Sequence, residues 1–173
     1  MNIAAIKDLD VANGPGVRVS VFVSGCNRHC RGCFNKETWD FKYGEPYTLE
    51  LEQKIIDYLQ NSRIRGLSIL GGEPFEDRNI QRVAGLVLRV HEEMPNLDIW
   101  CFSGYTYNDL IRKKNTSVNY VLDTIDVLVD GPFQIDKKNL MLKYRGSSNQ
   151  RLIDMKKTRE SGVIQLWEDK YDK

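Results

Sequence analysis

Hydrophobic residues fall along the chain in short β-branched runs that alternate with longer runs of helical spacing. The run Val17–Val23 follows the turn residues 13–16 and has little helical character, so it predicts a first strand. Residues 67–70, 99–102 and 125–129 are three further apolar runs, each followed by glycine-containing turn residues. Together these runs predict four short, well-buried strands.

Between these runs the apolar positions take on the period of an α-helix. Positions 51, 55, 56 and 59 share one helical face, and Thr48 stands where an N-cap is expected. Positions 80, 83, 84, 87 and 90 form a second such face, with Asp77 as the expected cap and Pro95 beyond its end. A third, shorter helix is expected over residues 107–113.

The resulting order, β-α-β-α-β-α-β, is typical of an α/β fold with parallel strands and right-handed crossovers. It has too few units for a closed eight-stranded barrel, so we expect a partial, open (βα) barrel formed by residues 1–173 as one domain. Ligands in such folds gather at the carboxyl ends of the strands. Residues 143–151 are expected to form a polar loop, and residues 163–167 a late strand.

Composition narrows the class of protein. The chain has 173 residues, of which 41% are hydrophobic, and this is enough apolar content for a folded core. It carries 25 basic and 24 acidic side chains, so its net charge is +1. The sequence has no block of basic residues, which argues against a nucleic-acid partner. It also has no apolar run long enough to span a membrane. Because the first residues also lack the pattern of an export signal, we expect a cytoplasmic protein.

The cysteines are the main candidates for chemistry. Cys26, Cys30 and Cys33 lie within eight residues, directly after the first predicted strand. In a reducing compartment such a cluster indicates zinc or iron–sulfur binding rather than disulfides. Cys101 alternates with Trp100 and Phe102 in an apolar run, so it is expected to be a buried core residue and not a fourth ligand.

Three thiolates around a cubane of four irons leave one iron without a protein ligand. The C-x3-C-x2-C spacing of Cys26, Cys30 and Cys33 resembles that of the radical S-adenosylmethionine enzymes. The resemblance implies that these cysteines bind one 4Fe-4S cluster and form the catalytic centre, and that S-adenosylmethionine is the second cofactor. In that superfamily, one electron from the cluster cleaves the sulfonium to give a 5′-deoxyadenosyl radical.

A glycine-rich segment strengthens the resemblance. Gly71, Gly72 and Glu73, which are followed by Pro74, resemble the segment that holds the methionine amino group in that superfamily. Backbone without side chains permits close approach, and a carboxylate accepts hydrogen bonds from an ammonium.

One position near the cysteines departs from the pattern. Many members have an aromatic residue before the third cysteine, where this chain has Gly32. Phe34 is expected to flank the adenine instead, so Gly32, Cys33 and Phe34 form the expected contact zone.

Four further segments resemble the glycyl-radical activating enzymes within the superfamily. Residues 13–18 and 33–39 resemble that family as a whole, and residues 127–133 and 144–150 resemble its branch that acts on anaerobic ribonucleoside-triphosphate reductase. The resemblance implies a partner, the large subunit of that reductase, in which a backbone glycine becomes a glycyl radical. It also implies a reduced flavodoxin-like protein as electron donor.

Other interpretations remain open from the residues alone. A non-catalytic zinc or iron–sulfur module would keep the cysteines without needing the glycine-rich turn, and a ferredoxin would need a fourth cysteine ligand. The activating enzyme of a formate-lyase type partner would share the same chemistry. Arg18 fits either a structural role or a contact with substrate or partner, and residues 145–150 fit either a partner contact or a structural turn.

Overall fold

A computed structural model describes residues 1–169 as a seven-stranded mixed sheet in the order β3-β1-β2-β4-β5-β6-β7. The four central strands are parallel: β2 (Val17–Val23), β4 (Ile64–Gly71), β5 (Asp98–Phe102) and β6 (Val127–Asp130). The three outer strands pair antiparallel: β1 (Asn2–Asp10), β3 (Glu45–Pro46) and β7 (Arg151–Asp154). Within the described residues β3 and β7 end the sheet, so it is open.

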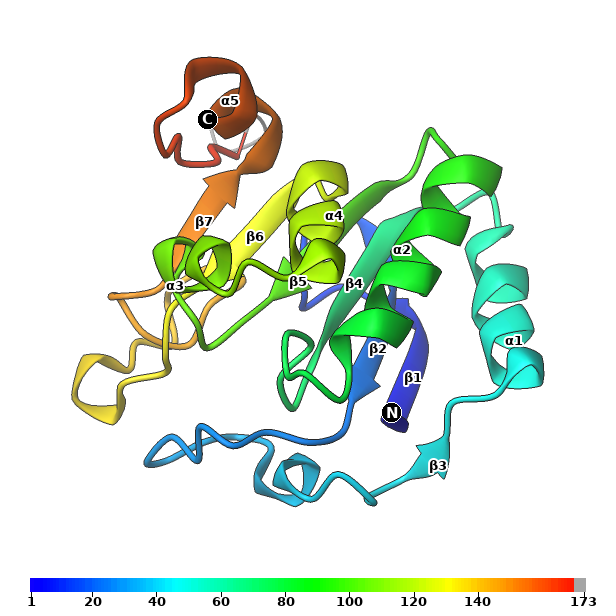
Figure 1. The fold of residues 1–173 in the computed structure, drawn as a ribbon, viewed down its shortest axis with the longest axis horizontal. Helices are drawn as coiled ribbons and strands as arrows, with labels where there is room; N and C mark the ends of the chain where they lie inside the picture. Colours follow the sequence, from blue (N-terminus) through cyan, green and yellow to red (C-terminus); the bar gives the residue numbers. More distant parts are fainter. Residues whose placement is uncertain (170–173) are drawn as a thin grey trace.

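In the described part of the chain, five α-helices accompany the sheet: α1 (Leu49–Leu59), α2 (Ile80–Glu93), α3 (Tyr107–Arg112), α4 (Thr116–Thr124) and α5 (Met155–Ser161). Figure 1 shows α2 and α4 in front of the central strands, with α1 beside β1 and β2. Two short 3-10 helices, η1 (Lys36–Trp39) and η2 (Ile135–Lys137), lie in the segments after β2 and β6. No helix within residues 1–169 is both long and apolar enough to cross a bilayer.

The predicted elements of the central sheet are confirmed with small shifts at their ends. The strand predicted at 67–70 begins three residues earlier, and the strand predicted at 125–129 occupies Val127–Asp130. Thr48 caps α1, because its hydroxyl accepts a hydrogen bond from the backbone N–H of Leu51. The predicted faces of α1 and α2 supply much of the hydrophobic core.

Three predictions are wrong, and the helix α4 is missed. Strands are not parallel throughout, because β1, β3 and β7 are antiparallel additions to the parallel centre. The N-cap of α2 is Asn79 and not Asp77, and α4 was not predicted. Residues 163–167 form no strand, since only Leu166 makes an isolated bridge, to Ile153.

Arg18 has a structural role at the amino end of the parallel strands. Its side chain is completely buried and ion-paired with Asp98 at 2.5 Å. Its Nε donates to the Ser68 hydroxyl at 2.7 Å, and an Nη donates to the carbonyl of Leu67 at 2.9 Å. These contacts join β2, β4 and β5 at the end of the sheet opposite the cysteines, so Arg18 is not a substrate contact.

Candidate functional site

A cavity of about 430 Å³ lies at the carboxyl ends of the parallel strands. Its wall comes from the segments after β2, β4, β5 and β6, and Figure 1 shows the blue segment after β2 and the yellow segment after β6 both projecting toward the lower left. The cavity is lined by all the predicted site residues except Gly32: Cys26, Cys30, Cys33, Phe34, Gly71, Gly72 and Glu73. The fold therefore brings together residues that lie up to 47 positions apart in the sequence.

The cysteine loop is held by backbone hydrogen bonds to the segment that follows it. Gly25 N–H donates to the carbonyl of Thr38 at 2.8 Å, and Cys26 N–H donates to the carbonyl of Trp39 at 3.2 Å. A tight turn joins the other two cysteines, because Cys33 N–H donates to the carbonyl of Cys30 at 3.1 Å. The three thiols therefore belong to one anchored loop on the cavity wall.

The three thiols differ in their surroundings. Cys26 is 8% exposed, whereas Cys30 and Cys33 are half-buried. Burial raises the pKa of the Cys26 thiol to about 11, with the nearby carboxylates of Glu73 and Glu76 adding to the effect. Because a thiolate is the form that binds metal, a metal at Cys26 must displace a proton.

No group of three His, Cys, Asp or Glu side chains in residues 1–169 surrounds a point suited to a single metal ion. A single ion needs its ligands to converge, whereas the thiolates around an iron–sulfur cubane bind separate irons and stand farther apart. Three thiols spread along one cavity wall fit the second arrangement better than the first.

Two glycines at the end of β4 are required by backbone packing: Gly71 is its last residue and Gly72 follows it. A Cβ on Gly72 would lie 2.7 Å from the carbonyl oxygen of Gly25 and 2.9 Å from that of Thr38. Gly71 has a φ of +107°, and a Cβ there would lie 2.6 Å from the carbonyl oxygen of Val23. The sequence interpretation assigned the missing side chains to ligand approach. The structure shows that Gly71 also allows close packing on β2, and that Gly72 allows the turn to contact the cysteine loop.

Glu73 is the buried carboxylate of the site. Its Oε1 accepts from Phe75 N–H at 3.0 Å and from the Ser103 hydroxyl at 2.9 Å, and its Oε2 accepts from Gly104 N–H at 2.7 Å. Complete burial raises the pKa of Glu73 to about 7, although these hydrogen bonds and the charge of Arg28 oppose the rise. Glu73 is therefore poised to exchange a proton or accept a cation near neutral pH.

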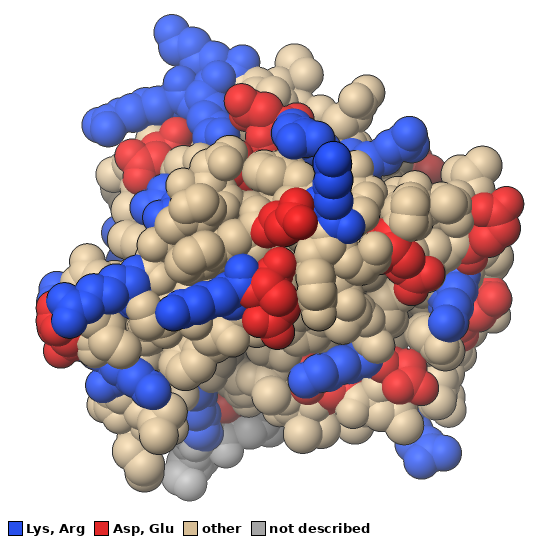
Figure 2. All heavy atoms as spheres, turned by 90° about the horizontal axis from the view of Figure 1, so that it is seen from below, with Lys and Arg blue, Asp and Glu red and all other residues tan. Residues whose placement is uncertain are grey.

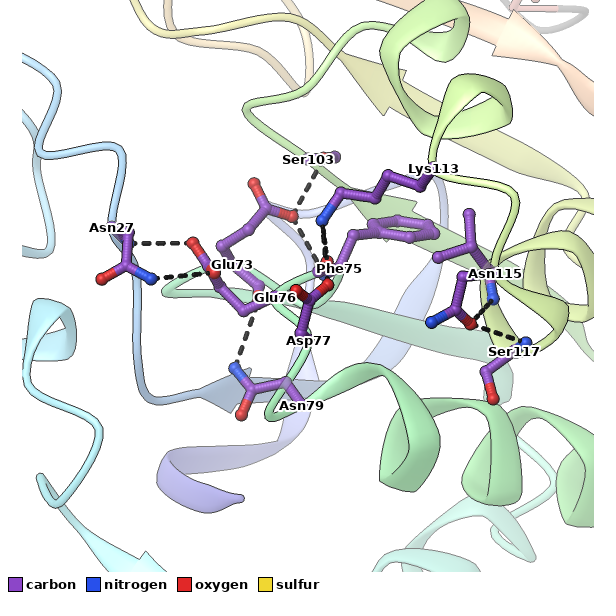
Figure 3. A network of polar contacts seen from close by, with 11 residues as sticks. Asn27, Glu73, Phe75, Glu76, Asp77, Asn79, Ser103, Lys113, Asn115 and Ser117 are labelled. Carbon is purple, nitrogen blue, oxygen red and sulfur yellow. Dashed lines mark hydrogen bonds and ion pairs between the residues drawn. The ribbon is translucent and has the colours of Figure 1, made fainter.

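Glu76 leaves the same turn in another direction and holds the cysteine loop. Its two carboxylate oxygens accept from the backbone N–H of Asn27 at 2.9 Å and from the Asn27 side chain at 3.0 Å. Figure 3 shows Asn27 and Ser103 on opposite sides of the two carboxylates, so one turn connects the cysteine loop to the segment after β5. The sequence analysis missed Glu76, although a second acid three residues after Glu73 at the same sheet edge was an available signal.

Asn79 completes this connection from beneath. Its side-chain N–H donates to the carbonyls of Ser24 at 2.9 Å and Glu73 at 3.0 Å. The residue that caps α2 thus also fixes the distance between the cysteine loop and the glycine-rich turn.

Aromatic rings line the part of the cavity wall where the cysteine loop meets the segment after β6. Phe34 is 59% exposed and packs on Phe133 with 5.1 Å between ring centroids, and the ammonium of Lys138 lies 4.9 Å from the Phe34 centroid. Gly32 does not line the cavity; it packs against Ile135, where a Cβ on Gly32 would lie 2.7 Å from Cδ1. Both residues thus join the cysteine loop to the segment after β6.

Residues 145–150 form a turn that satisfies its own backbone. Oε1 of Gln150 accepts from the N–H groups of Gly146 at 2.9 Å and Ser147 at 3.1 Å, and its side-chain N–H donates to the carbonyl of Gly131 at 3.1 Å. These bonds agree with the structural interpretation of this turn, while the partner contact stays a prediction. Arg145, Gly146 and Gln150 also line the cavity.

Cys101 lies apart from the other cysteines. It is fully buried in the hydrophobic core, as predicted, and burial raises the pKa of its thiol well above the usual value. It does not line the cavity.

Charged side chains of both signs occur on the face of the molecule drawn in Figure 2. Figure 2 shows Lys and Arg interspersed with Asp and Glu over the face seen from below, with uncharged surface between them. On that face no broad patch of one sign is visible.

Comparison with known proteins identifies relatives along nearly the whole chain. Residues 12–153 match the family model of the 4Fe-4S single cluster domain. A Salmonella typhimurium protein is 46% identical over 144 residues, which cover 82% of this chain and 91% of the relative. An Escherichia coli K12 protein is 43% identical over 152 residues (87% and 96%), and one from Enterobacteria phage T4 is 38% identical over 154 residues (88% and 93%). Each of these relatives is named anaerobic ribonucleoside-triphosphate reductase-activating protein.

Proposed function

The chain belongs to the family of anaerobic ribonucleoside-triphosphate reductase-activating proteins, and on that premise we propose that it installs a glycyl radical in the large subunit of such a reductase. When bound, a 4Fe-4S cluster supplies one electron that splits S-adenosylmethionine, and the 5′-deoxyadenosyl radical takes a hydrogen atom from a backbone glycine of that subunit. The protein's own residues bind and orient the two cofactors and leave room for the partner. In this proposal the chain is a radical S-adenosylmethionine oxidoreductase.

In this proposal Cys26, Cys30 and Cys33 are the cluster ligands. Their position on one anchored loop and one cavity wall supports the assignment. Cys101, the fourth cysteine, is buried in the core and is therefore not proposed as a ligand. Three protein ligands leave one iron free for S-adenosylmethionine, whereas an electron-transfer ferredoxin fills that position with cysteine.

Gly71, Gly72 and Glu73 hold the methionine end of S-adenosylmethionine. The carboxylate of Glu73 provides a buried acceptor for an ammonium, and an ammonium beside it would in turn stabilise its charged form. Phe34 offers its ring to the adenine from the opposite wall, with Cys33 beside it, while Gly32 contributes to this zone through the path of the backbone.

The open sheet corresponds in this proposal to a partial (βα) barrel of the radical S-adenosylmethionine type, built as one domain of a cytoplasmic protein. Its open side admits a polypeptide segment to the cavity. A reduced flavodoxin-like protein is the proposed electron donor, as family resemblance implies.

The observation that carries the proposal is the meeting of three cysteines and the Gly71–Glu73 turn in one cavity. The test is anaerobic reconstitution with iron and sulfide, followed by mixing with reductant, S-adenosylmethionine and the reductase large subunit. Electron paramagnetic resonance should show a glycyl-radical doublet, and one 5′-deoxyadenosine should form per radical. Cys30→Ala is the control that should give neither.

Two results would contradict the proposal. A doublet only with a formate-lyase type partner would assign the protein to that activating enzyme instead. Zinc without iron in the anaerobically purified protein, together with no cleavage of S-adenosylmethionine after reconstitution, would indicate a non-catalytic metal-binding module.

A further inference from the structure

Arg28 is a cation of the cavity wall that the proposed function leaves without a role. It follows Cys26 by two residues on the cysteine loop and lines the same cavity. Its Nε is buried and has no hydrogen-bond partner among the described residues. A buried donor without an acceptor is uncommon in folded proteins, so this guanidinium has hydrogen-bonding capacity that no described residue uses.

The guanidinium of Arg28 is held in place by its neighbours. Its central carbon lies 4.6 Å from the ring centroid of Tyr105, an arrangement that favours a stacked cation. The side chain crosses Gly104 so closely that a Cβ there would lie 2.6 Å from Nε. The absence of a side chain at Gly104 therefore gives Arg28 its path into the cavity.

Glu73 lies near Gly104 as well, so the Gly104 position is bordered by both Arg28 and Glu73. The point at which a Cβ of Gly104 would stand is 3.4 Å from Oε2 of Glu73, and Gly104 N–H donates to that oxygen at 2.7 Å. Arg28 and Glu73 are not within ion-pair distance, although the charge of Arg28 opposes the raised pKa of Glu73. A guanidinium and a buried carboxylate thus stand side by side on the wall of one cavity.

We propose that Arg28 binds the carboxylate of the methionine moiety while Glu73 accepts from its ammonium. This inference rests on the proposed function and makes Arg28 a specificity residue for the α-amino acid end of S-adenosylmethionine. A guanidinium suits this task because its rigid fork donates two parallel hydrogen bonds to one carboxylate. A carboxylate offers about four acceptor positions, so contact with Arg28 leaves others free.

Decarboxylated S-adenosylmethionine provides the test, because it keeps the ammonium and the sulfonium but lacks the carboxylate. Binding of both compounds to the iron-loaded protein is measured by anaerobic equilibrium dialysis, for wild type, Arg28→Gln and Arg28→Lys. Arg28→Gln should weaken S-adenosylmethionine about ten-fold to one-hundred-fold and change binding of the decarboxylated compound by less than about two-fold. The affinity of Arg28→Lys for S-adenosylmethionine should lie between those of wild type and Arg28→Gln, because lysine keeps the positive charge but lacks the two parallel donors of a guanidinium.

Arg31→Gln is the matched control, because Arg31 is an exposed arginine on the same loop that does not line the cavity. It should bind both compounds as wild type does. Iron content should be equal in all variants.

Four outcomes would overturn the inference. Equal weakening of both compounds in Arg28→Gln would show that Arg28 acts through Glu73 or the loop and not on the carboxylate. Unchanged binding of S-adenosylmethionine in Arg28→Gln would exclude any contact. If iron-loaded wild type bound neither compound, the proposed function itself would fail, whereas equal binding of both by wild type would remove only the role of Arg28.

Discussion

Replacing Gly72 by alanine tests how the glycine-rich turn supports the cysteine loop. The added Cβ would stand 2.7 Å from the carbonyl oxygen of Gly25 and 2.9 Å from that of Thr38, where ordinary contact begins at 3.4 Å. The turn and the loop must therefore separate by roughly 0.7 Å. Neither neighbour is a flexible side chain, so backbone has to move.

Overpacking of this kind costs about 1–3 kcal/mol of unfolding free energy. With a urea m-value of about 1–3 kcal/mol/M, we expect the unfolding midpoint of the reduced apoprotein to fall by about 1 M. Because Gly25 precedes Cys26, the shift should also expose the Cys26 thiol. Alkylation at pH 8, followed by mass spectrometry of the Cys26 peptide, should then be faster than in wild type.

Gly85→Ala is the matched control within α2. A Cβ at Gly85 meets nothing within 4 Å, and alanine is favoured over glycine in a helix by about 0.5–1 kcal/mol. This variant should raise the urea midpoint and leave Cys26 alkylation unchanged. If Gly72→Ala unfolded at the same urea concentration as wild type, with unchanged alkylation of Cys26, the argument from backbone contact would be refuted.

Three further predictions concern the site. Cys30→Ala should lose most cluster absorbance after reconstitution, whereas Cys101→Ala should keep it and lose only core stability; the reverse pattern would contradict the ligand assignment. The pKa of Glu73 is about 7 in the folded protein, against an ordinary value of 4.5. Because ionised Glu73 is less stable in the folded than in the unfolded chain, the free energy of unfolding should fall as pH rises from about 4.5 to 7. Urea midpoints of the apoprotein should show a fall worth about 3 kcal/mol, and Glu73→Gln should remove that dependence. Glu76→Gln should lower stability by about 1–3 kcal/mol and speed alkylation of the loop cysteines, because an amide cannot accept both hydrogen bonds from Asn27; equal alkylation rates would exclude this anchoring role.

The sequence predicts best the elements whose burial is strongest. The central strands and the faces of α1 and α2 are found because their apolar residues repeat with a clear period. The strand β1 is missed because it lacks a continuous buried apolar run: four of its nine residues are exposed, and only Ile3 and Asp10 in it are buried. β1 forms a strand because it pairs with β2, and its own residue pattern does not predict this pairing.

The candidate site is predictable only where its residues are neighbours in sequence. The cysteines and the Gly71–Glu73 turn form local motifs, so the sequence indicates them as candidate site residues. The bond between Glu76 and Asn27 spans 49 residues, and the contact between Phe34 and Phe133 spans 99. Contacts of this range depend on how strands pair and loops meet, which no local pattern specifies.

The contact between Phe34 and Phe133 has a consequence for the order in which the molecule is made. The cysteine loop leaves the ribosome early, but the wall it packs against is encoded about one hundred residues later. At about 5–20 residues per second, the loop waits roughly 5–20 seconds for that wall. Iron that arrived in this interval would meet exposed thiols without an enclosing cavity, so synthesis must be nearly finished before the site can shield what it binds.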